Sequence, residues 1–218
     1  MDVDRKLKLN CSLDNLLEGG IEFGIITEIY GEGGTGKTNI CIQASKSCAS
    51  EGKKVVYIDT EGISKERILQ VVKEKKLLEK LLFFSPFSLK EQEEMVTKAL
   101  KIDSGLIILD SANLFYRLEM VDDEARATRS LTNQLIKLQI EARKRDIPVI
   151  ITSQVYSVGE EVKPFAGRTM DHIAKTIIML EKAGNKNGKE IRKATIMKHR
   201  SLPEGKSAIF YITGDGIE

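Results

Sequence analysis

A glycine-rich segment at residues 31–38, GEGGTGKT, constrains this chain more than any other feature. It matches the phosphate-binding pattern G-x-x-x-x-G-K-[ST] at every fixed position, between a predicted strand at 25–30 and a predicted helix at 39–49. In such a loop, backbone N–H groups bond phosphate oxygens, and the helix adds the positive end of its dipole. The alternative is a glycine-rich turn that happens to precede a helix. The matched positions and their setting favour the phosphate-binding loop.

Two residues of this loop have specific expected roles. Lys37 is expected to reach the β- and γ-phosphates of a nucleotide, and the hydroxyl of Thr38 is expected to bind Mg²⁺. We also expect the Lys37 side chain to be exposed when no phosphate is bound.

Length and composition fit a single domain over 1–218, with a short lead-in at 1–24. The chain has 218 residues, of which 41% are hydrophobic and 30% are charged, as in an ordinary globular protein. The net charge of +2 is too small to indicate a nucleic-acid partner, so any DNA-binding surface must come from local clusters of basic residues. Three cysteines without C-x-x-C spacing indicate reduced thiols. Because we find no signal peptide and no apolar run of about 18 residues, we expect a cytoplasmic protein without a membrane span.

Strand and helix patterns alternate after the loop, whereas the last part of the chain contains strand patterns separated by turns. The stretch 73–82 is charged and amphipathic, and its interleaved glutamates favour a solvated helix face over a DNA-binding patch. This order predicts an α/β fold in which a mostly parallel central sheet is flanked by helices and has antiparallel C-terminal edge strands. The expected strands are 54–59, 81–84, 105–110, 148–153, 174–180, 191–197 and 207–212; the expected helices are 13–17, 64–75, 88–101 and 123–144; and 184–188 is the expected hairpin loop.

Polar residues at strand ends are candidates for metal binding and hydrolysis. Asp110 ends the apolar run LIIL, which is the setting of a carboxylate that holds Mg²⁺ through water, although apolar strands ending in Asp are common. Ser111 follows it, where many phosphate-loop ATPases have Glu. Glu61 lies just past the strand 54–59, and the carboxyl ends of parallel strands share one rim of a sheet. Glu61 is therefore the candidate that positions the attacking water, the alternative being a solvated loop carboxylate.

Gln154 follows the strand 148–153 directly. Its amide is placed to bond a γ-phosphate and to pull on the segment 155–168, which contains glycine, proline and charged residues and is expected to be mobile. Such a residue would couple nucleotide state to a partner. The residues alone leave this role open.

Taken together, these segments resemble the RecA class of recombinases, most closely its archaeal RadB branch. The resemblance implies a RecA-like core, binding of ATP with Mg²⁺, binding of DNA, and a role in homologous recombination and DNA repair. It implies that Glu61 positions water and that Gln154 senses the γ-phosphate, so the implied catalytic residues are Lys37, Glu61 and Gln154. The matching stretches are LDNLLEGGIEFGIITEIYGEGGTGKT, YIDTEG, LIILDS, ITSQV and KATIMKHRSLPEGKSAIFYIT.

The resemblance adds contacts at the base and at a subunit interface. The Arg of a Glu-Arg-Ile/Leu motif packs on adenine in this class, and Arg67 fits that motif, although the preceding spacing is one residue shorter. Lys198 and Arg200 resemble a K-x-R arrangement that reaches a neighbouring subunit's ATP; the alternative is a basic patch at a strand end. The implied ATP-binding residues are Gly31, Glu32, Gly33, Gly34, Thr35, Gly36, Lys37, Thr38, Asn39 and Arg67, and the implied Mg²⁺ ligands are Thr38 and Asp110.

Departures from the larger recombinases suggest an accessory role. Those proteins carry an N-terminal helical DNA-binding domain and polymerise through a Phe-x-x-Ala segment, and residues 1–24 contain no such segment. Their second DNA loop is longer, whereas here 155–168 is short and contains Glu160 and Glu161. The remaining candidates for DNA binding are Arg117, Arg126, Arg129, Lys163 and Arg168.

We therefore expect an accessory protein with at most weak ATPase activity. Its expected partners are single-stranded DNA and the main recombinase of the same cell, and it is expected to be a monomer or dimer without long filaments of its own. The competing hypotheses are a regulatory ATPase of the same fold that binds no DNA, and a small-molecule kinase. A kinase predicts an Arg-rich lid after the core, and the antiparallel tail argues against it.

Overall fold

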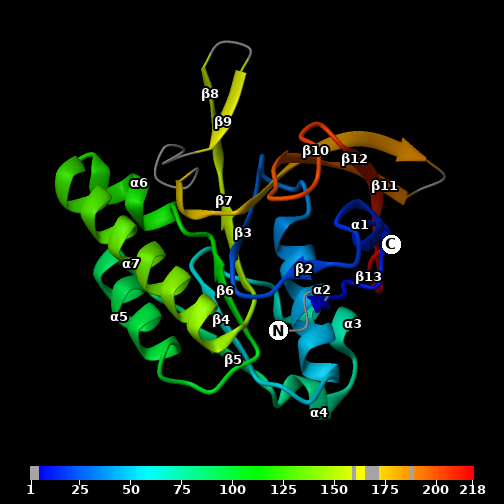
Figure 1. The fold of residues 1–218 in the computed structure, drawn as a ribbon, viewed down its shortest axis with the longest axis horizontal. Coiled ribbons are helices and arrows are strands. Elements are labelled where there is room, and N and C mark those ends of the chain that lie inside the picture. The colour runs from blue at the N-terminus through cyan, green and yellow to red at the C-terminus, as the bar shows by residue number, and fades with distance from the viewer. Residues whose placement is uncertain (1–4, 159–160, 165–171, 187–188) are drawn as a thin grey trace.

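A sheet of nine strands forms the centre of the part that this computed structural model describes, residues 5–158, 161–164, 172–186 and 189–218 (Figure 1). The strands in the order β10-β3-β7-β6-β4-β5 run parallel, and β11, β12 and β13 continue the sheet beyond β10 in antiparallel order. This arrangement confirms the predicted fold class. The bounds are β3 (Ile26–Gly31), β4 (Val55–Asp59), β5 (Leu81–Phe84), β6 (Leu106–Asp110), β7 (Val149–Ser153), β10 (Thr176–Lys186), β11 (Lys189–Lys198), β12 (Ser207–Thr213) and β13 (Gly216–Ile217).

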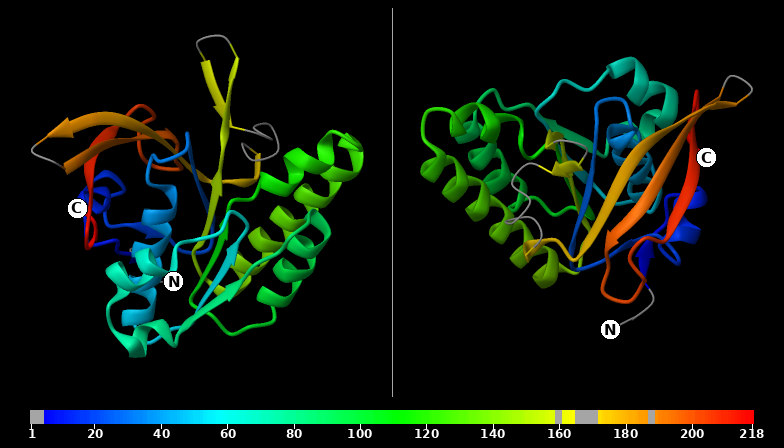
Figure 2. Two further views of the ribbon diagram at one scale, coloured as in Figure 1. Left: turned by 180° about the vertical axis from the view of Figure 1, so that it is seen from behind. Right: turned by 90° about the horizontal axis from the view of Figure 1, so that it is seen from above.

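Helices cover both faces of the parallel part of the sheet, which makes three layers (Figures 1 and 2). Helices α2, α3 and α4 lie on one face, and α5, α6 and α7 lie on the other, while α1 packs near β12. None of the described helices is long and apolar enough to cross a membrane. The bounds are α1 (Ser12–Leu16), α2 (Lys37–Ser50), α3 (Lys65–Val72), α4 (Lys75–Leu78), α5 (Leu89–Ala99), α6 (Leu114–Met120) and α7 (Glu124–Arg145).

Both faces of the central strands are buried, which explains their nearly continuous apolar sequences. In β6, Leu106 and Ile108 pack into the core on the α2 side, whereas Ile107 and Leu109 pack into the core on the α5–α7 side. Successive side chains of a strand point to opposite faces, so a strand covered on both faces needs apolar residues at every position. The apolar run therefore places Asp110, the first polar residue after it, at the carboxyl end of the strand.

The structure differs from the predicted elements in several places. The predicted helix 64–75 ends at Val72, because Lys73 has a positive φ of 58°, which an α-helix does not allow. The stretch 73–82 then forms only the short helix α4 before β5. The expected loop 155–168 contains two paired antiparallel strands. Strand β10 extends into the expected loop 184–188 as far as Lys186, and 187–188 lie outside the described residues. Elements that were not predicted are α6, β13, β1 (Lys6–Leu7), β2 (Ile21–Glu22), β8 (Val155–Val158) and β9 (Glu161–Pro164).

Gly31 lies where the parallel sheet meets its antiparallel extension. It ends β3 and is opposite Leu180 of β10 in the strand register. A Cβ at Gly31 would lie 2.4 Å from the carbonyl oxygen of Leu180 and 2.9 Å from Oγ1 of Thr35. The first position of the phosphate-binding loop therefore has no room for a side chain.

We expect Gly31→Ala to destabilise the fold by about 1–3 kcal/mol, because the added carbon forces β10 away from β3. Gly33→Ala in the same loop is the control, since a Cβ there meets nothing within 4 Å and the cost should stay within about 0.5 kcal/mol. Urea unfolding of the two variants measures the difference. Equal free energies of unfolding for both variants would contradict the register of β3 and β10.

Candidate nucleotide-binding site

A cleft of about 270 Å³ opens at the carboxyl ends of the parallel strands. The phosphate-binding loop and the first turn of α2 form one side, and residues just past β4 and β7 form another. The first part of β11 and the last part of β12 contribute a side that the sequence did not predict. The lining residues are Gly33, Gly34, Gly36, Lys37, Thr38, Asn39, Glu61, Gln154, Glu190 and Ile212.

Lys37 is buried, and the expectation that it would be exposed is wrong. Its ammonium donates hydrogen bonds to the carbonyl oxygens of Gly31 (2.7 Å) and Glu32 (2.9 Å). Burial lowers the pKa of Lys37, and the carboxylates of Glu61 and Asp110 act in the opposite direction. The loop thus wraps around the Lys37 ammonium because its own carbonyl groups are the nearest acceptors for a cation taken out of water.

Asp110 and Thr38, the predicted Mg²⁺ ligands, are in direct contact. The Thr38 hydroxyl donates to Oδ2 of Asp110 at 2.8 Å, and the Tyr57 hydroxyl donates to the same oxygen at 2.6 Å. The Thr152 hydroxyl donates to Oδ1 of Asp110. Burial raises the pKa of Asp110, and these three hydrogen bonds oppose that shift. The carboxylate is therefore held in one orientation beside the loop.

The donor set of this contact suits Mg²⁺. A hydroxyl and a carboxylate are hard oxygen ligands, and Mg²⁺ is usually held by one or two protein oxygens together with water and substrate phosphates. Among the described residues, no group of three or more His, Cys, Asp or Glu side chains is arranged to hold a metal ion. Thr38 and Asp110 would accordingly act together with phosphate oxygens.

Tyr57 and Thr152 were not predicted, and only the strand order explains them. They lie on β4 and β7, the strands on either side of β6. Their hydroxyls therefore reach Asp110 from opposite sides. A tyrosine within one apolar run and a threonine within another carry no signal in the sequence until the neighbours of β6 are known.

Glu61 and Gln154 meet at the mouth of the cleft. The side-chain amide of Gln154 donates to Oε1 of Glu61 at 3.0 Å. The carboxylate of Asp59 accepts the backbone N–H groups of 61–63 and fixes the turn that carries Glu61. Asn113 bonds both the N–H and the carbonyl of Gln154 and fixes its backbone. The structure thus brings together the two residues expected to position water and to sense the γ-phosphate.

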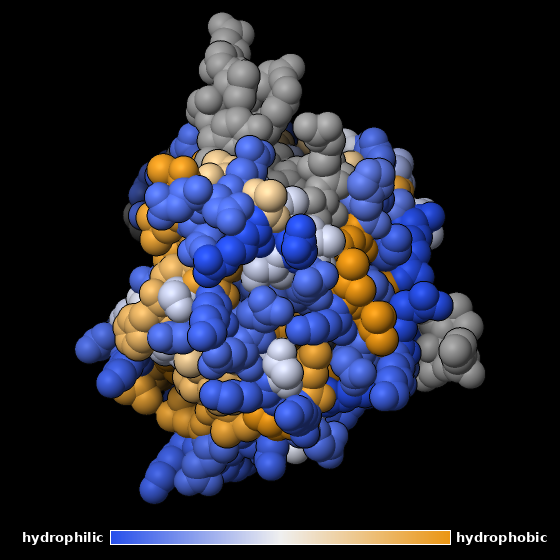
Figure 3. All heavy atoms as spheres, turned by 90° about the vertical axis from the view of Figure 1, so that its left-hand side faces the viewer, coloured by the Kyte–Doolittle hydropathy of each residue, from blue (hydrophilic) through white to orange (hydrophobic). Residues whose placement is uncertain are grey.

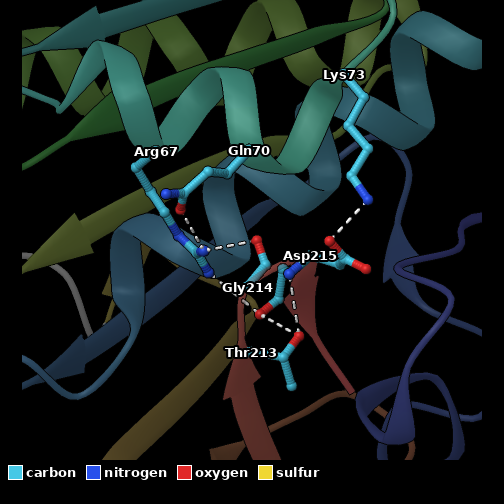
Figure 4. A network of polar contacts seen from close by, with 7 residues as sticks. Arg67, Gln70, Lys73, Thr213, Gly214 and Asp215 are labelled. Atoms are coloured by element: carbon cyan, nitrogen blue, oxygen red, sulfur yellow. Dashed lines mark hydrogen bonds and ion pairs between the residues drawn. The ribbon is translucent and has the colours of Figure 1, made fainter.

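Arg67 lies beside the cleft but is not among its lining residues. Its guanidinium donates to Oδ1 of Asn39 at 2.6 Å and to the carbonyl oxygens of Gly214 and Gly216, both at 3.2 Å. Figure 4 shows these contacts of α3 with the turn after β12, next to the ion pair of Lys73 with Asp215. Arg67 therefore anchors the C-terminal turn next to Asn39, and its contact with adenine stays a prediction.

Lys198 lies at the end of β11 that is away from the cleft, and Arg200 follows this strand. Lys198 is opposite Ile177 in the hairpin, whereas Leu180 is the residue opposite Gly31, and Glu190 at the other end of β11 lines the cleft. The Lys198 ammonium donates to the carbonyl of Ala174. These residues are therefore placed away from a nucleotide in the same chain. Contact with a neighbouring subunit's ATP stays a prediction.

The candidate DNA-binding residues do not form one cluster among the described residues. Arg126 and Arg129, on the first turns of α7, line a hollow of about 210 Å³ with Lys90 of α5, and Arg126 pairs with Glu119 at 2.9 Å. Figure 3 shows the side formed by α5–α7 as largely hydrophilic with separate apolar patches. Arg117 lies on α6. Lys163 lies on β9, whose side chains are not described, and Arg168 and Glu160 lie outside the described residues.

The chain is similar to proteins of one family along almost its whole length. The sequence model of the Rad51 family matches residues 8–218. The DNA repair and recombination protein RadB of Methanococcoides burtonii is 45% identical over 225 residues, covering 99% of this chain and 98% of that protein. RadB of Thermoplasma acidophilum is 46% identical over 212 residues, covering 94% and 90%. A solved crystal structure of the RadB recombinase matches with a TM-score of 0.84 and 34% identity, covering 97% and 98%.

We expect Asp110→Asn to stabilise the nucleotide-free protein near neutral pH while weakening Mg²⁺-dependent nucleotide binding. Because the folded-state pKa of Asp110 is raised, the ionised carboxylate costs stability above that pKa, and the cost disappears as the pH falls through it. A cost of about 1 kcal/mol corresponds to a rise in Tm of about 2–4 °C.

Melting curves from neutral to acidic pH measure this effect, and the gap between the variant and the parent should narrow with acid. Asp59→Asn is the contrasting variant, since Asp59 accepts three backbone N–H groups. Unlike the hydroxyls around Asp110, these groups cannot turn to accept from an amide N–H, so the replacement should lower Tm. An Asp110→Asn protein that melts below the parent at every pH would contradict this view of the carboxylate.

Proposed function

Because the chain belongs to the Rad51 family, and within it to the archaeal RadB proteins, we propose that it is an ATP-binding and DNA-binding accessory protein of homologous recombination and DNA repair. The name shared by its relatives, DNA repair and recombination protein, supports the process. In this proposal the protein acts in the cytoplasm, assists or regulates the main recombinase, and is a monomer or dimer without long filaments of its own.

The contact between Thr38 and Asp110 beside the buried Lys37 carries the nucleotide part of the proposal. Lys37 would exchange loop carbonyls for the β- and γ-phosphates, and Thr38 would bind Mg²⁺ directly while Asp110 holds it through water. When bound, Mg²⁺ neutralises charge on the phosphates. Asp110 would in turn gain the opposite charge that its burial makes favourable.

The pair of Glu61 and Gln154 supports slow, Mg²⁺-dependent hydrolysis. Glu61 would orient the attacking water, and Gln154 would bond the γ-phosphate. Their mutual hydrogen bond of 3.0 Å uses one of the two N–H groups of the Gln154 amide and one oxygen of the Glu61 carboxylate. The second N–H is therefore available for the γ-phosphate, and the second carboxylate oxygen is available for the water. We therefore propose weak ATPase activity in which this hydrogen-bonded pair acts as a unit.

The DNA part of the proposal rests on family membership and on a few basic residues. The candidates are Arg117, Arg126, Arg129, Lys163 and Arg168, and single-stranded DNA is the proposed ligand. The ion pair of Arg126 with Glu119 favours the alternative, a regulatory ATPase of this fold without DNA, because a paired arginine contributes less charge toward a phosphate.

We expect Lys37→Ala to lower ATP affinity by about 10–100-fold, the value of a charge-assisted hydrogen bond. Glu61→Gln is the matched variant, which should bind ATP normally and lose phosphate release. Calorimetry measures the ATP affinity, melting curves show whether the variants are folded, and a phosphate-release assay measures hydrolysis. A folded Lys37→Ala protein with parental ATP affinity would remove the phosphate-binding role of the loop. Parental hydrolysis by Glu61→Gln would assign the water to another group.

For DNA, we expect Arg126→Ala combined with Arg129→Ala to weaken binding of a single-stranded oligonucleotide. Removing two phosphate contacts should reduce the slope of log K against log salt by about 1.4. The control is Lys98→Ala with Lys101→Ala, which removes the same charge from exposed positions on and just after α5 and should leave the slope unchanged. Fluorescence anisotropy at several salt concentrations measures both. A parental protein that binds no DNA at low salt would favour the DNA-free regulatory ATPase.

A further inference from the structure

Arg192 of β11 is a buried arginine that contacts the phosphate-binding loop. Its Nε donates to the carbonyl oxygen of Gly34 at 3.0 Å, and its Nη2 donates to the carboxylate of Glu190. Its Nη1 donates to the carbonyl of Ile191 at 3.0 Å. The residue is only 6% exposed, and arginine is rarely so buried unless its donors are paired. These contacts join the antiparallel end of the sheet to the loop.

Arg192 belongs to a cross-strand row that faces the loop. It is opposite Lys182 of β10 on one side and Phe210 of β12 on the other. A Cβ at Gly34 would lie 3.6 Å from the Lys182 ammonium, and a Cβ at Gly36 would lie 3.4 Å from the ring of Phe210. The second half of the loop therefore packs against three neighbouring strands, with Arg192 in the middle.

The contact with Gly34 constrains the backbone of the loop. A peptide group is planar, so a carbonyl fixed toward β11 directs the following N–H, that of Thr35, to the opposite side. Backbone N–H groups in such loops are the donors that bind phosphate. Arg192 thus holds one end of this peptide, and the carbonyl of Glu32, which accepts the Thr35 N–H at 3.4 Å, holds the other.

Arg192 also forms an ion pair with Glu190, and this pair affects the charge of the cleft. Glu190 lines the cleft, and its negative charge would repel phosphates if it were unpaired. The ion pair with Arg192 directs this carboxylate and offsets its charge. Replacing Arg192 would therefore release both the Gly34 carbonyl and the Glu190 carboxylate, and the experiment must separate the two consequences.

We propose that Arg192 is a positioning residue of the nucleotide site, which holds the phosphate-binding loop in its receptive shape through the Gly34 carbonyl. This inference rests on the proposed binding of ATP. It assigns a role to the C-terminal strands in that binding, since the residue that fixes the loop comes from β11 and not from the loop or α2.

The test is ATP affinity measured by calorimetry for Arg192→Gln, Glu190→Gln and the double variant. We expect Arg192→Gln to bind ATP about tenfold more weakly, as for a lost charged hydrogen bond. Glu190→Gln should bind ATP at least as tightly as the parent, and the double variant should stay weak. Lys193→Gln is the matched control, because Lys193 is the next residue of β11, pairs with Glu181 and carries the same charge. It should bind as the parent does.

Two further readouts separate positioning from general stability. Amide hydrogen exchange of 31–38 without nucleotide should rise in Arg192→Gln by more than its loss of global stability accounts for, and it should stay at the parental level in Lys193→Gln. Arg192→Lys should recover part of the lost ATP affinity, because it keeps the positive charge. The recovery should be incomplete, because an ammonium cannot reproduce the planar arrangement by which arginine bonds both Gly34 and Glu190. If Arg192→Gln does not fold, Arg192→Lys gives the same test against the parent.

Each outcome decides the inference. Parental ATP affinity and loop exchange in the Arg192 variants would overturn it, as would full recovery of affinity in the double variant, which would reduce Arg192 to neutralising Glu190. A lower Tm with unchanged affinity would make Arg192 a purely structural residue. A parental protein that binds no ATP would instead refute the proposed function itself.

Discussion

The parallel pairing of β3, β7, β6 and β4 is the constraint on which the site depends. Their register sets the carboxyl ends of these strands side by side, so that Asp59 is opposite Asp110 and Tyr30 is opposite Ser153. Residues that follow the strands then meet at one rim, whatever their separation in sequence. Four segments of the chain therefore converge at this rim, and they carry Thr38, Glu61, Asp110 and Gln154. Each segment follows or ends one of the four paired strands.

The same arrangement buries two charged side chains, Lys37 and Asp110. Burial lowers the pKa of Lys37 and raises that of Asp110, so the folded chain disfavours the charged form of each group. The surrounding carbonyls and hydroxyls offset part of this cost, and a bound triphosphate with its metal ion would offset more. Buried charges of this kind lower the stability of the fold, which is common where a protein keeps charged side chains for binding.

The sequence predicts the parts of the structure that follow from local pattern. Local patterns predict the glycine-rich loop, the succession of the main strands along the chain and the carboxylate at the end of β6. Glycines, apolar runs and the first polar residue after a run each have local causes. Arg192, Tyr57 and Thr152 are not readable, because their roles depend on which strands are neighbours. Lys37 is the instructive error, since the motif predicts its ligand but not the loop carbonyls that it contacts in the folded chain.

Gln154 links the cleft to two other parts of the molecule. It is the one residue between β7 and β8, so its backbone joins the end of β7 to the strand pair β8–β9. Asn113, at the start of α6, bonds its backbone on both sides. Exchanging one hydrogen bond of the Gln154 amide for another changes the free energy little. In the proposed function, the γ-phosphate, which ATP has and ADP lacks, would bias these elements only through the difference in its contacts between two arrangements of Gln154.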